Sequence, residues 1–149
     1  NLDVDTMHLK FNFPTKEEFK IDTRTTLIKN KITNEEYLEY KNALEGHSMN
    51  AIWHVTPPEC YGVELNFNQR KTFFFQLLQM LLDDGKIKLA SHGRYLQGSS
   101  TEQISFFKKR FPKKQEEMEE DAFDGFWFLT ENCPGGIVWI HENGYEDWT

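Results

Sequence analysis

The chain has 149 residues, of which 15% are aromatic and 38% hydrophobic, and its formal net charge is −7. This length suits one domain that buries roughly two thirds of its unfolded surface without disulfides or metal. The negative charge argues against nonspecific binding to nucleic acid or to an anionic membrane, because both reward a basic face.

The N-terminal third predicts one clear helix. Residues 2–32 have little periodicity and predict one or two weak extended pieces with loops. Thr33 and Glu36 then have the spacing of a capping box, in which each side chain bonds the other residue's backbone amide. We therefore expect a helix over residues 34–44, ended by Gly46.

The central part predicts a short strand and the longest helix. Ala51 to Val55 suggests a strand, which Pro57-Pro58 would end. Asn68 is a candidate cap for a helix over residues 69–84. Its apolar residues recur at three- and four-residue spacing, as expected of a core helix. They are Phe73, Phe74, Leu77, Leu78, Leu81 and Leu82.

A strand and a third helix follow. Lys86 to Ala90 alternates charged and apolar side chains, which is typical of a half-exposed strand. Ser100 and Gln103 then have capping spacing and predict a helix over residues 101–110, closed by Pro112. We expect residues 113–121, which are highly charged, to form either a solvated helix or a loop.

The C-terminal segment predicts three strands. They cover residues 126–130, 136–141 and 145–148, and Asn143-Gly144 is the signal for a type I′ turn before the last. The whole chain, residues 1–149, is thus expected to be a single α+β domain. Its helices would pack on a mainly antiparallel sheet with a C-terminal three-stranded meander.

The acidic residues are unevenly distributed. Residues 115–149 carry ten carboxylates, no Lys or Arg and three of the four Trp, whereas residues 1–114 carry all 17 basic and the other 14 acidic side chains. Two interpretations stay open. The carboxylates either keep strand edges from pairing with other chains or accept Arg and Lys from a basic partner.

No catalytic or metal-binding pattern is evident. Cys133 lies in a Pro-Gly-Gly turn with no identifiable His or Asp partner, and Cys60 is far from it in sequence. The five His residues are scattered without a ligand spacing. We therefore expect no enzyme activity, no cofactor and no metal. The separated cysteines, with no membrane span or signal peptide pattern, favour a reduced, cytoplasmic protein.

Two polar segments have weaker ligand-binding features. The loop from His92 to Ser100 ends at a helix start, where an anion can bind, but it lacks the Gly pattern and Lys of a phosphate loop. A basic run could contact phosphates, but the acidic tail next to it would repel them. We therefore expect its side chains to pair internally with carboxylates at i,i+4 spacing. This run comprises Lys108, Lys109, Arg110, Lys113 and Lys114.

Residues 68–149 resemble a family of small bacterial proteins catalogued as a domain of unknown function, whereas residues 1–67 match it weakly. The segments that carry the resemblance are Leu81–Leu89, Gly98–Gln103, Phe111-Pro112, Asp124–Phe128 and Cys133–Trp139. Members of the family occur beside contact-dependent growth inhibition and polymorphic toxin loci. The resemblance therefore implies an immunity protein that binds and neutralises a cognate toxin C-terminal domain.

The acidic tail is compatible with that role, because an acidic surface accelerates association with a basic nuclease toxin. The partner-binding residues expected from it are Glu116, Glu117, Glu119, Glu120, Asp121 and Asp124. The alternatives are a single-stranded nucleic-acid-binding protein, whose exposed rings stack on bases, and a homodimeric adaptor. Neither a nucleic acid nor a membrane is the expected partner.

Overall fold

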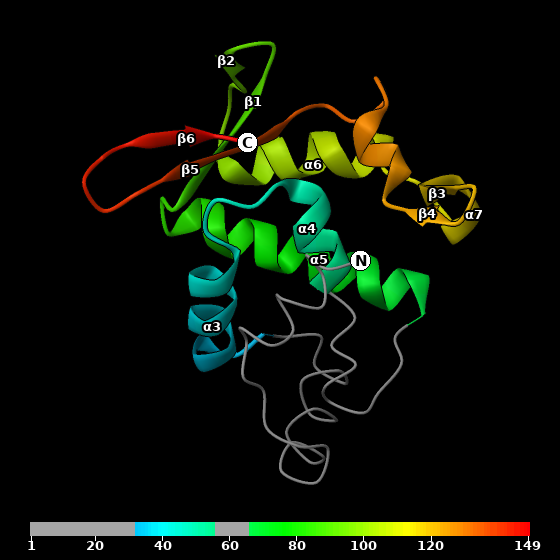
Figure 1. Ribbon diagram of the computed structural model, residues 1–149, viewed down its shortest axis with the longest axis horizontal. Helices are drawn as coiled ribbons and strands as arrows, with labels where there is room; N and C mark the ends of the chain where they lie inside the picture. Colours follow the sequence, from blue (N-terminus) through cyan, green and yellow to red (C-terminus); the bar gives the residue numbers. More distant parts are fainter. Residues whose placement is uncertain (1–31, 56–65) are drawn as a thin grey trace, which may run out of the picture.

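The computed structural model describes residues 32–55 and 66–149, and it packs helices against a curled antiparallel sheet (Figure 1). The predicted α+β fold is confirmed. The weak extended pieces expected over residues 2–31 and the break at Pro57-Pro58 lie outside the described residues.

Helix α3 (Asn34–Leu44) confirms the first predicted helix, including its cap. The Thr33 hydroxyl accepts a hydrogen bond of 3.2 Å from the Glu36 amide, and the Glu36 carboxylate accepts one of 2.8 Å from the Thr33 amide. These bonds satisfy amides that the helix itself leaves without acceptors.

The strand predicted over residues 51–55 is wrong, because this segment belongs to helix α4 (Met49–Val55). Met49, Ile52 and Trp53 are buried, and their spacing of three and four residues places them on one helical face. A short apolar run does not distinguish a strand from a buried helix by periodicity alone.

Helix α5 (Phe67–Asp83) crosses the middle of the molecule (Figure 1). It begins two residues earlier than predicted, because Asn66 rather than Asn68 forms the cap, in a capping box with Gln69. The predicted core face is otherwise confirmed. Its fully buried members include Phe74, Leu77, Leu78 and Leu81.

Strand β1 (Ile87–Ser91) and helix α6 (Ser100–Arg110) match their predictions within one residue. The cap of α6 also lies earlier than expected, by one position, since Ser99 and Glu102 form its capping box. Helices α5 and α6 pack side by side (Figure 1).

The main sheet has the strand order β2-β1-β5-β6, built from β2 (Arg94–Tyr95), β5 (Gly136–Ile140) and β6 (Glu146–Trp148) around β1. All pairs are antiparallel. Ile87 opposes Trp139 and Leu89 opposes Ile137, so these buried side chains share the core face.

The predicted three-stranded C-terminal meander is wrong, because its first strand is the 3-10 helix η2 (Phe126–Leu129). The neighbour of β5 opposite β6 is β1. The sequence Phe126–Leu129 is apolar at every position and so carries no period of two. The buried Trp127 packs instead on Phe111, with ring centroids 5.1 Å apart.

The turn between β5 and β6 also differs from the prediction. Gly144 has a positive φ of +85°, but Asn143 does not, so the turn is not type I′. The Gly144 amide donates to the His141 carbonyl and the His141 amide to the Tyr145 carbonyl. This is the three-residue hairpin loop in which a left-handed glycine follows a type I turn.

Candidate functional site

The predicted partner-binding carboxylates lie at one end of the molecule, on the segment that we call the acidic hairpin, residues 115–124. It contains helix α7 (Gln115–Met118) and the paired strands β3 (Glu119–Glu120) and β4 (Phe123–Asp124). Glu116, Glu117, Glu120 and Asp121 are exposed, and Glu119 and Asp124 are half-buried.

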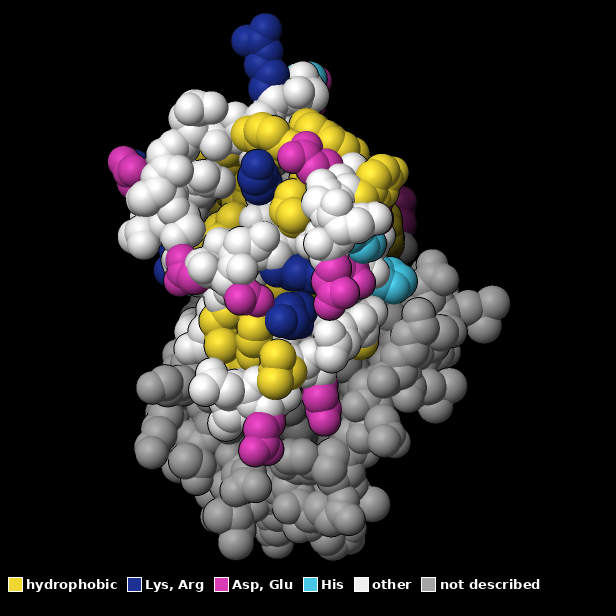
Figure 2. Space-filling model, turned by 90° about the vertical axis from the view of Figure 1, so that its left-hand side faces the viewer, with side chains coloured by type: hydrophobic (Ala, Val, Ile, Leu, Met, Phe, Trp, Pro, Cys, Tyr) yellow, Lys and Arg dark blue, Asp and Glu magenta, His cyan; other side chains and the backbone are white. Residues whose placement is uncertain are grey.

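Three of the later tail carboxylates, Glu142, Glu146 and Asp147, lie at the opposite end, on the hairpin of β5 and β6 (Figure 1), whereas Glu131 lies in the turn after residues 126–129. Figure 2 views that end, where acidic, basic and hydrophobic side chains are intermixed. The ten tail carboxylates therefore do not form one acidic field. Only the acidic hairpin keeps several exposed carboxylates together within ten residues of chain.

Asp124 fixes the acidic hairpin to the core. One carboxylate oxygen pairs with the Arg70 guanidinium at 2.8 Å. The other oxygen accepts hydrogen bonds of 2.9 Å from the Trp53 indole N–H and from the side-chain amide of Gln115. Burial raises the pKa of Asp124, but these bonds and the Arg70 charge outweigh it and hold that pKa below its ordinary value.

Arg70 is itself held by the core. Its guanidinium carbon lies 3.9 Å from the Trp53 ring centroid, and its Nη2 donates a 3.0 Å hydrogen bond to the Trp53 carbonyl. Trp53, Arg70 and Asp124 thus join α4, α5 and β4, three elements that are distant in sequence. The Asp124 carboxylate holds the acidic hairpin in place, and both of its oxygens already have partners within the fold.

The remaining predicted carboxylates differ in whether they have hydrogen-bond partners within the fold. Glu119 accepts a 2.7 Å hydrogen bond from the Gln115 amide, and Glu117 accepts one of 3.3 Å from the Lys113 backbone amide. Glu116, Glu120 and Asp121 make no ion pair or side-chain hydrogen bond with the described residues. These three are best placed to meet a cationic partner.

The tip of the acidic hairpin is a strained turn. Asp121 and Ala122 have φ of +52° and +66°, and Glu120 opposes Phe123 across them, as in a type I′ turn. Alanine rarely adopts this conformation, which costs about 1 kcal/mol or more. Strained residues of this kind are enriched at functional sites. Next to the tip, the Phe123 side chain is 40% exposed.

Gly125 connects the acidic hairpin to η2 and touches α4. Its φ is +99°, and a Cβ atom there would lie 2.1 Å from Asn50 Oδ1. The backbone conformation therefore favours glycine at this position, and a larger residue would also have to displace the Asn50 side chain. The Asp-Gly pair at 124–125 is thus explained by the anchoring of the hairpin.

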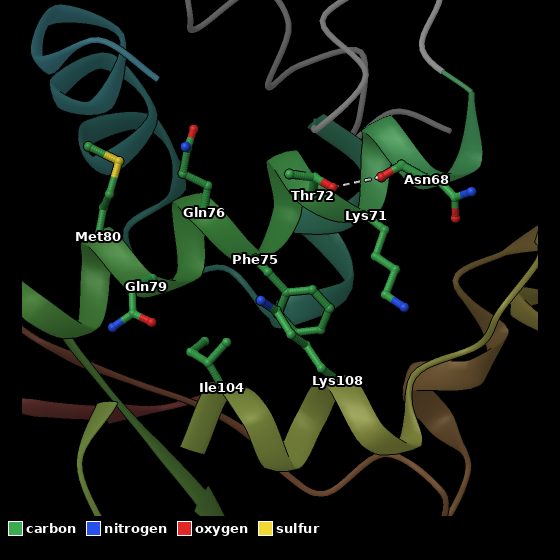
Figure 3. A pocket seen from close by; sticks show the side chains of 9 residues that line it. All are labelled: Asn68, Lys71, Thr72, Phe75, Gln76, Gln79, Met80, Ile104 and Lys108. Carbon is green, nitrogen blue, oxygen red and sulfur yellow. Dashed lines mark hydrogen bonds between the residues drawn. The ribbon is translucent and has the colours of Figure 1, made fainter. Parts of the chain in front are cut away.

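The internal pairing predicted for the basic run is wrong. Within residues 32–55 and 66–149, none of these five basic side chains forms an ion pair. The Lys108 ammonium instead lies 5.6 Å from the Phe75 ring centroid, facing a groove between α5 and α6 (Figure 3). Lys113 follows the end of α6, and its ammonium group forms no ion pair with the carboxylates of α7.

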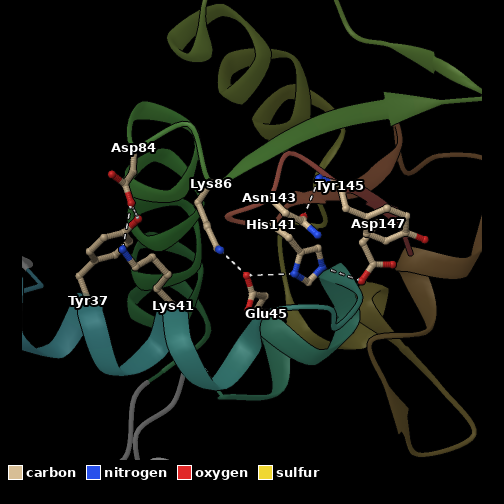
Figure 4. A network of polar contacts seen from close by, with 9 residues as sticks. All are labelled: Tyr37, Lys41, Glu45, Asp84, Lys86, His141, Asn143, Tyr145 and Asp147. Atoms are coloured by element: carbon tan, nitrogen blue, oxygen red, sulfur yellow. Dashed lines mark hydrogen bonds and ion pairs between the residues drawn. The ribbon is translucent and has the colours of Figure 1, made fainter.

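The opposite end of the molecule is held by a charged network (Figure 4). Glu45 at the end of α3 pairs with Lys86, and its carboxylate lies 3.3 Å from His141 Nδ1. His141 Nε2 lies 3.1 Å from the Asp147 carboxylate. This chain of contacts joins the end of α3 to the β5–β6 hairpin through His141 and Asp147. Among the hairpin carboxylates, Asp147 is therefore engaged within the fold, whereas Glu142 is exposed.

Cys133 has the surroundings of a structural thiol. Its Sγ donates to the Gly135 carbonyl at 3.3 Å, and burial raises the pKa of the thiol to about 11. A thiol with this pKa is a poor nucleophile near neutral pH. No three His, Cys, Asp or Glu side chains of the described residues are arranged to hold a metal ion.

Comparisons with known proteins give the following likenesses. Residues 82–149 match a family described as "Protein of unknown function, DUF596". A solved structure, an uncharacterized protein conserved in bacteria from Neisseria meningitidis, is similar in fold with a TM-score of 0.56 and 21% identity. The similarity covers 99% of this chain and 95% of that one. No curated protein matches the chain.

None of the helices in the described residues is long and apolar enough to cross a membrane. The family match covers the segment that contains the acidic hairpin, the 3-10 helix and the β5–β6 hairpin. Together, the family match and the bacterial structure support an uncharacterised bacterial family as the relatives of this chain.

Proposed function

We propose that this protein is an immunity protein, which binds a cognate contact-dependent or polymorphic bacterial toxin in the cytoplasm and neutralises it. The observation that carries this proposal is the acidic hairpin, where exposed Glu116, Glu120 and Asp121 lie close in sequence to the exposed Phe123 ring. The toxin context comes from the resemblance described above, and the toxin of this proposal is a basic nuclease domain.

The geometry suits fast and tight binding to a basic protein. Carboxylates gathered on one surface steer a cationic partner and raise its association rate by roughly 10- to 1,000-fold. An exposed aromatic ring beside such carboxylates, as Phe123 is, can be fully desolvated on binding, as in interaction hot spots. The Asp124 anchor holds both groups in place before binding, which lowers the entropy lost on association.

Charge reversal tests the proposal. The partner used in the test is the purified basic nuclease domain of a cognate toxin. We expect E116K/E117K/E120K to slow its association tenfold or more at low salt and to flatten the salt dependence, because the steering field is lost. Stopped-flow fluorescence at several salt concentrations measures both quantities.

A matched control separates local from overall charge. E39K/E131K/E142K produces the same change in net charge on exposed residues outside the acidic hairpin. We expect this variant to lose much less of the association rate and to keep protecting cells in co-expression. Equal effects of the two triple variants would contradict the assignment of the site, and failure of the wild type to bind or protect would contradict the function.

Nucleic-acid binding has one feature in its favour. Tyr95 and Trp148 lie side by side on the outer face of the sheet, with ring centroids 5.3 Å apart, and the Lys88 ammonium lies 4.6 Å from the Tyr95 centroid. However, Glu146 contacts both Lys88 and Tyr95 and places a negative charge on this platform. Titration with labelled single-stranded oligonucleotides decides the matter, and we expect no binding at physiological salt.

A further inference from the structure

A groove of about 560 Å³ lies between α5 and α6, on residues to which the proposed function gives no role. Lys71 reaches into it from α5 and Lys108 from α6 (Figure 3). Among the residues that the structure describes, none of the side chains that line it is Asp or Glu. In a chain with a net charge of −7, this is a local concentration of positive charge, and the nearby Asp83 carboxylate bonds Gln79 and Ser100 rather than either lysine.

The lysines of this groove repel one another. Burial lowers the pKa of Lys71, and the charges of Lys108 and Lys113 lower it further. Neither Lys71 nor Lys108 forms an ion pair within the described part of the chain. Like charges held close together are unfavourable in the free protein, and an anion bound between them would relieve the repulsion.

The floor of the groove is apolar. Phe75 and Ile104 are buried there, one from each helix. In the view of Figure 3, the two ammonium groups lie on either side of the Phe75 ring. At the other end, the Gln79 amide donates to the Ser100 hydroxyl at 2.8 Å, which joins the two helices. The groove thus offers two ammonium groups that flank an apolar floor between the helices.

We propose that this groove binds a small organic phosphate monoester whose apolar body lies against Phe75 and Ile104. A phosphate monoester carries about −1.5 to −2 charges at neutral pH, which matches two or three ammonium groups better than a single carboxylate does. Lysine binds phosphate as a point charge. The volume lies within the range of roughly 300–1,000 Å³ that is usual for small-molecule sites.

Calorimetric titration with phenyl phosphate tests the proposal. We expect saturable binding to the wild type and binding weaker by roughly tenfold to hundredfold in K71Q/K108Q, because charge-assisted hydrogen bonds are lost. K109Q/K114Q is the matched control, because both lysines are exposed and do not line the groove. It should bind phenyl phosphate as the wild type does.

A second measurement needs no variant. NMR titration of the Lys71 side chain should show that its pKa rises when phenyl phosphate binds, since the ligand adds negative charge beside the ammonium. Phenol and phthalate separate the roles of the ring and of the charge. No binding by phenyl phosphate, equal binding by K71Q/K108Q and K109Q/K114Q, or tighter binding of phthalate would each overturn the proposal.

Discussion

Ala122 is the residue that best shows the strain in the acidic hairpin. Its φ of +66° lies in the left-handed region, where the Cβ atom of an L-residue crowds the backbone. Glycine has no such penalty, so we expect A122G to stabilise the protein by about 0.5–1 kcal/mol. Urea unfolding followed by circular dichroism measures the difference in the free energy of unfolding.

The same substitution in a helix should have the opposite sign. Ala43 lies in α3, where glycine costs about 0.5–1 kcal/mol, so A43G is a suitable control. Strain retained at an exposed tip is consistent with selection for its shape. If A122G stabilises the fold but weakens toxin binding, the strain serves the interface. A destabilised A122G would contradict the assigned turn geometry.

Asp124 gives a prediction about pH. Its pKa is depressed in the folded state, so it binds protons more weakly there than in the unfolded chain. Its contribution to stability is therefore complete above its unfolded pKa and is lost as the pH falls through the folded pKa, below about pH 4. D124N should lose about 2 kcal/mol at neutral pH, because the Arg70 charge remains without its partner.

The pH dependence of the unfolding free energy shows whether the charge of Asp124 causes the loss of stability in D124N. Between neutral pH and pH 2 the difference in unfolding free energy between D124N and the wild type should shrink, as the wild type protonates Asp124. E131Q, at an exposed position, should follow the wild type throughout. A constant difference between D124N and the wild type at all pH values would mean that shape, not charge, holds Asp124 in place.

Elements with a local signal in the sequence were predictable. The helix over 34–44 was predicted with both ends correct, because its capping box and its terminal glycine are encoded within a few residues. α4 and η2 were missed, since their short apolar runs acquire a conformation only from packing on distant rings such as Phe74 and Phe111. The anchoring role of Asp124 was missed for the same reason, because its partners Trp53 and Arg70 are distant in sequence.

At the scale of elements, Gly125 tests how the acidic hairpin is joined to α4. G125A should destabilise the protein by about 1–2 kcal/mol, because its Cβ is strained at a positive φ and must displace the Asn50 side chain. G144A is the comparison, since Gly144 also has a positive φ but nothing within 4 Å of the added atom. Equal losses in thermal unfolding would show that the Asn50 contact is unimportant.

The whole molecule presents two chemically different ends. One carries exposed carboxylates on an anchored hairpin, and at the other Glu45 and Asp147 are paired with Lys86 and His141. The sequence put all ten carboxylates into one tail, but the chain passes through η2 and β5 between the two groups and separates them in space (Figure 1). A count of charge along the chain therefore overstated the acidic field that a partner would meet.

This separation predicts that stability and association can be changed independently. E45Q weakens the contacts of Glu45 with Lys86 and His141, and we expect it to lower the free energy of unfolding by about 1 kcal/mol, because the pair is partly exposed. The acidic hairpin lies at the other end, beyond the reach of a screened charge at physiological salt. Toxin association measured by stopped flow should therefore be unchanged in E45Q, whereas E116K/E117K/E120K should slow association and leave urea unfolding nearly unchanged. A slower association of E45Q would mean that the two ends are coupled through α5, and the acidic hairpin could then no longer be treated as a preformed binding surface.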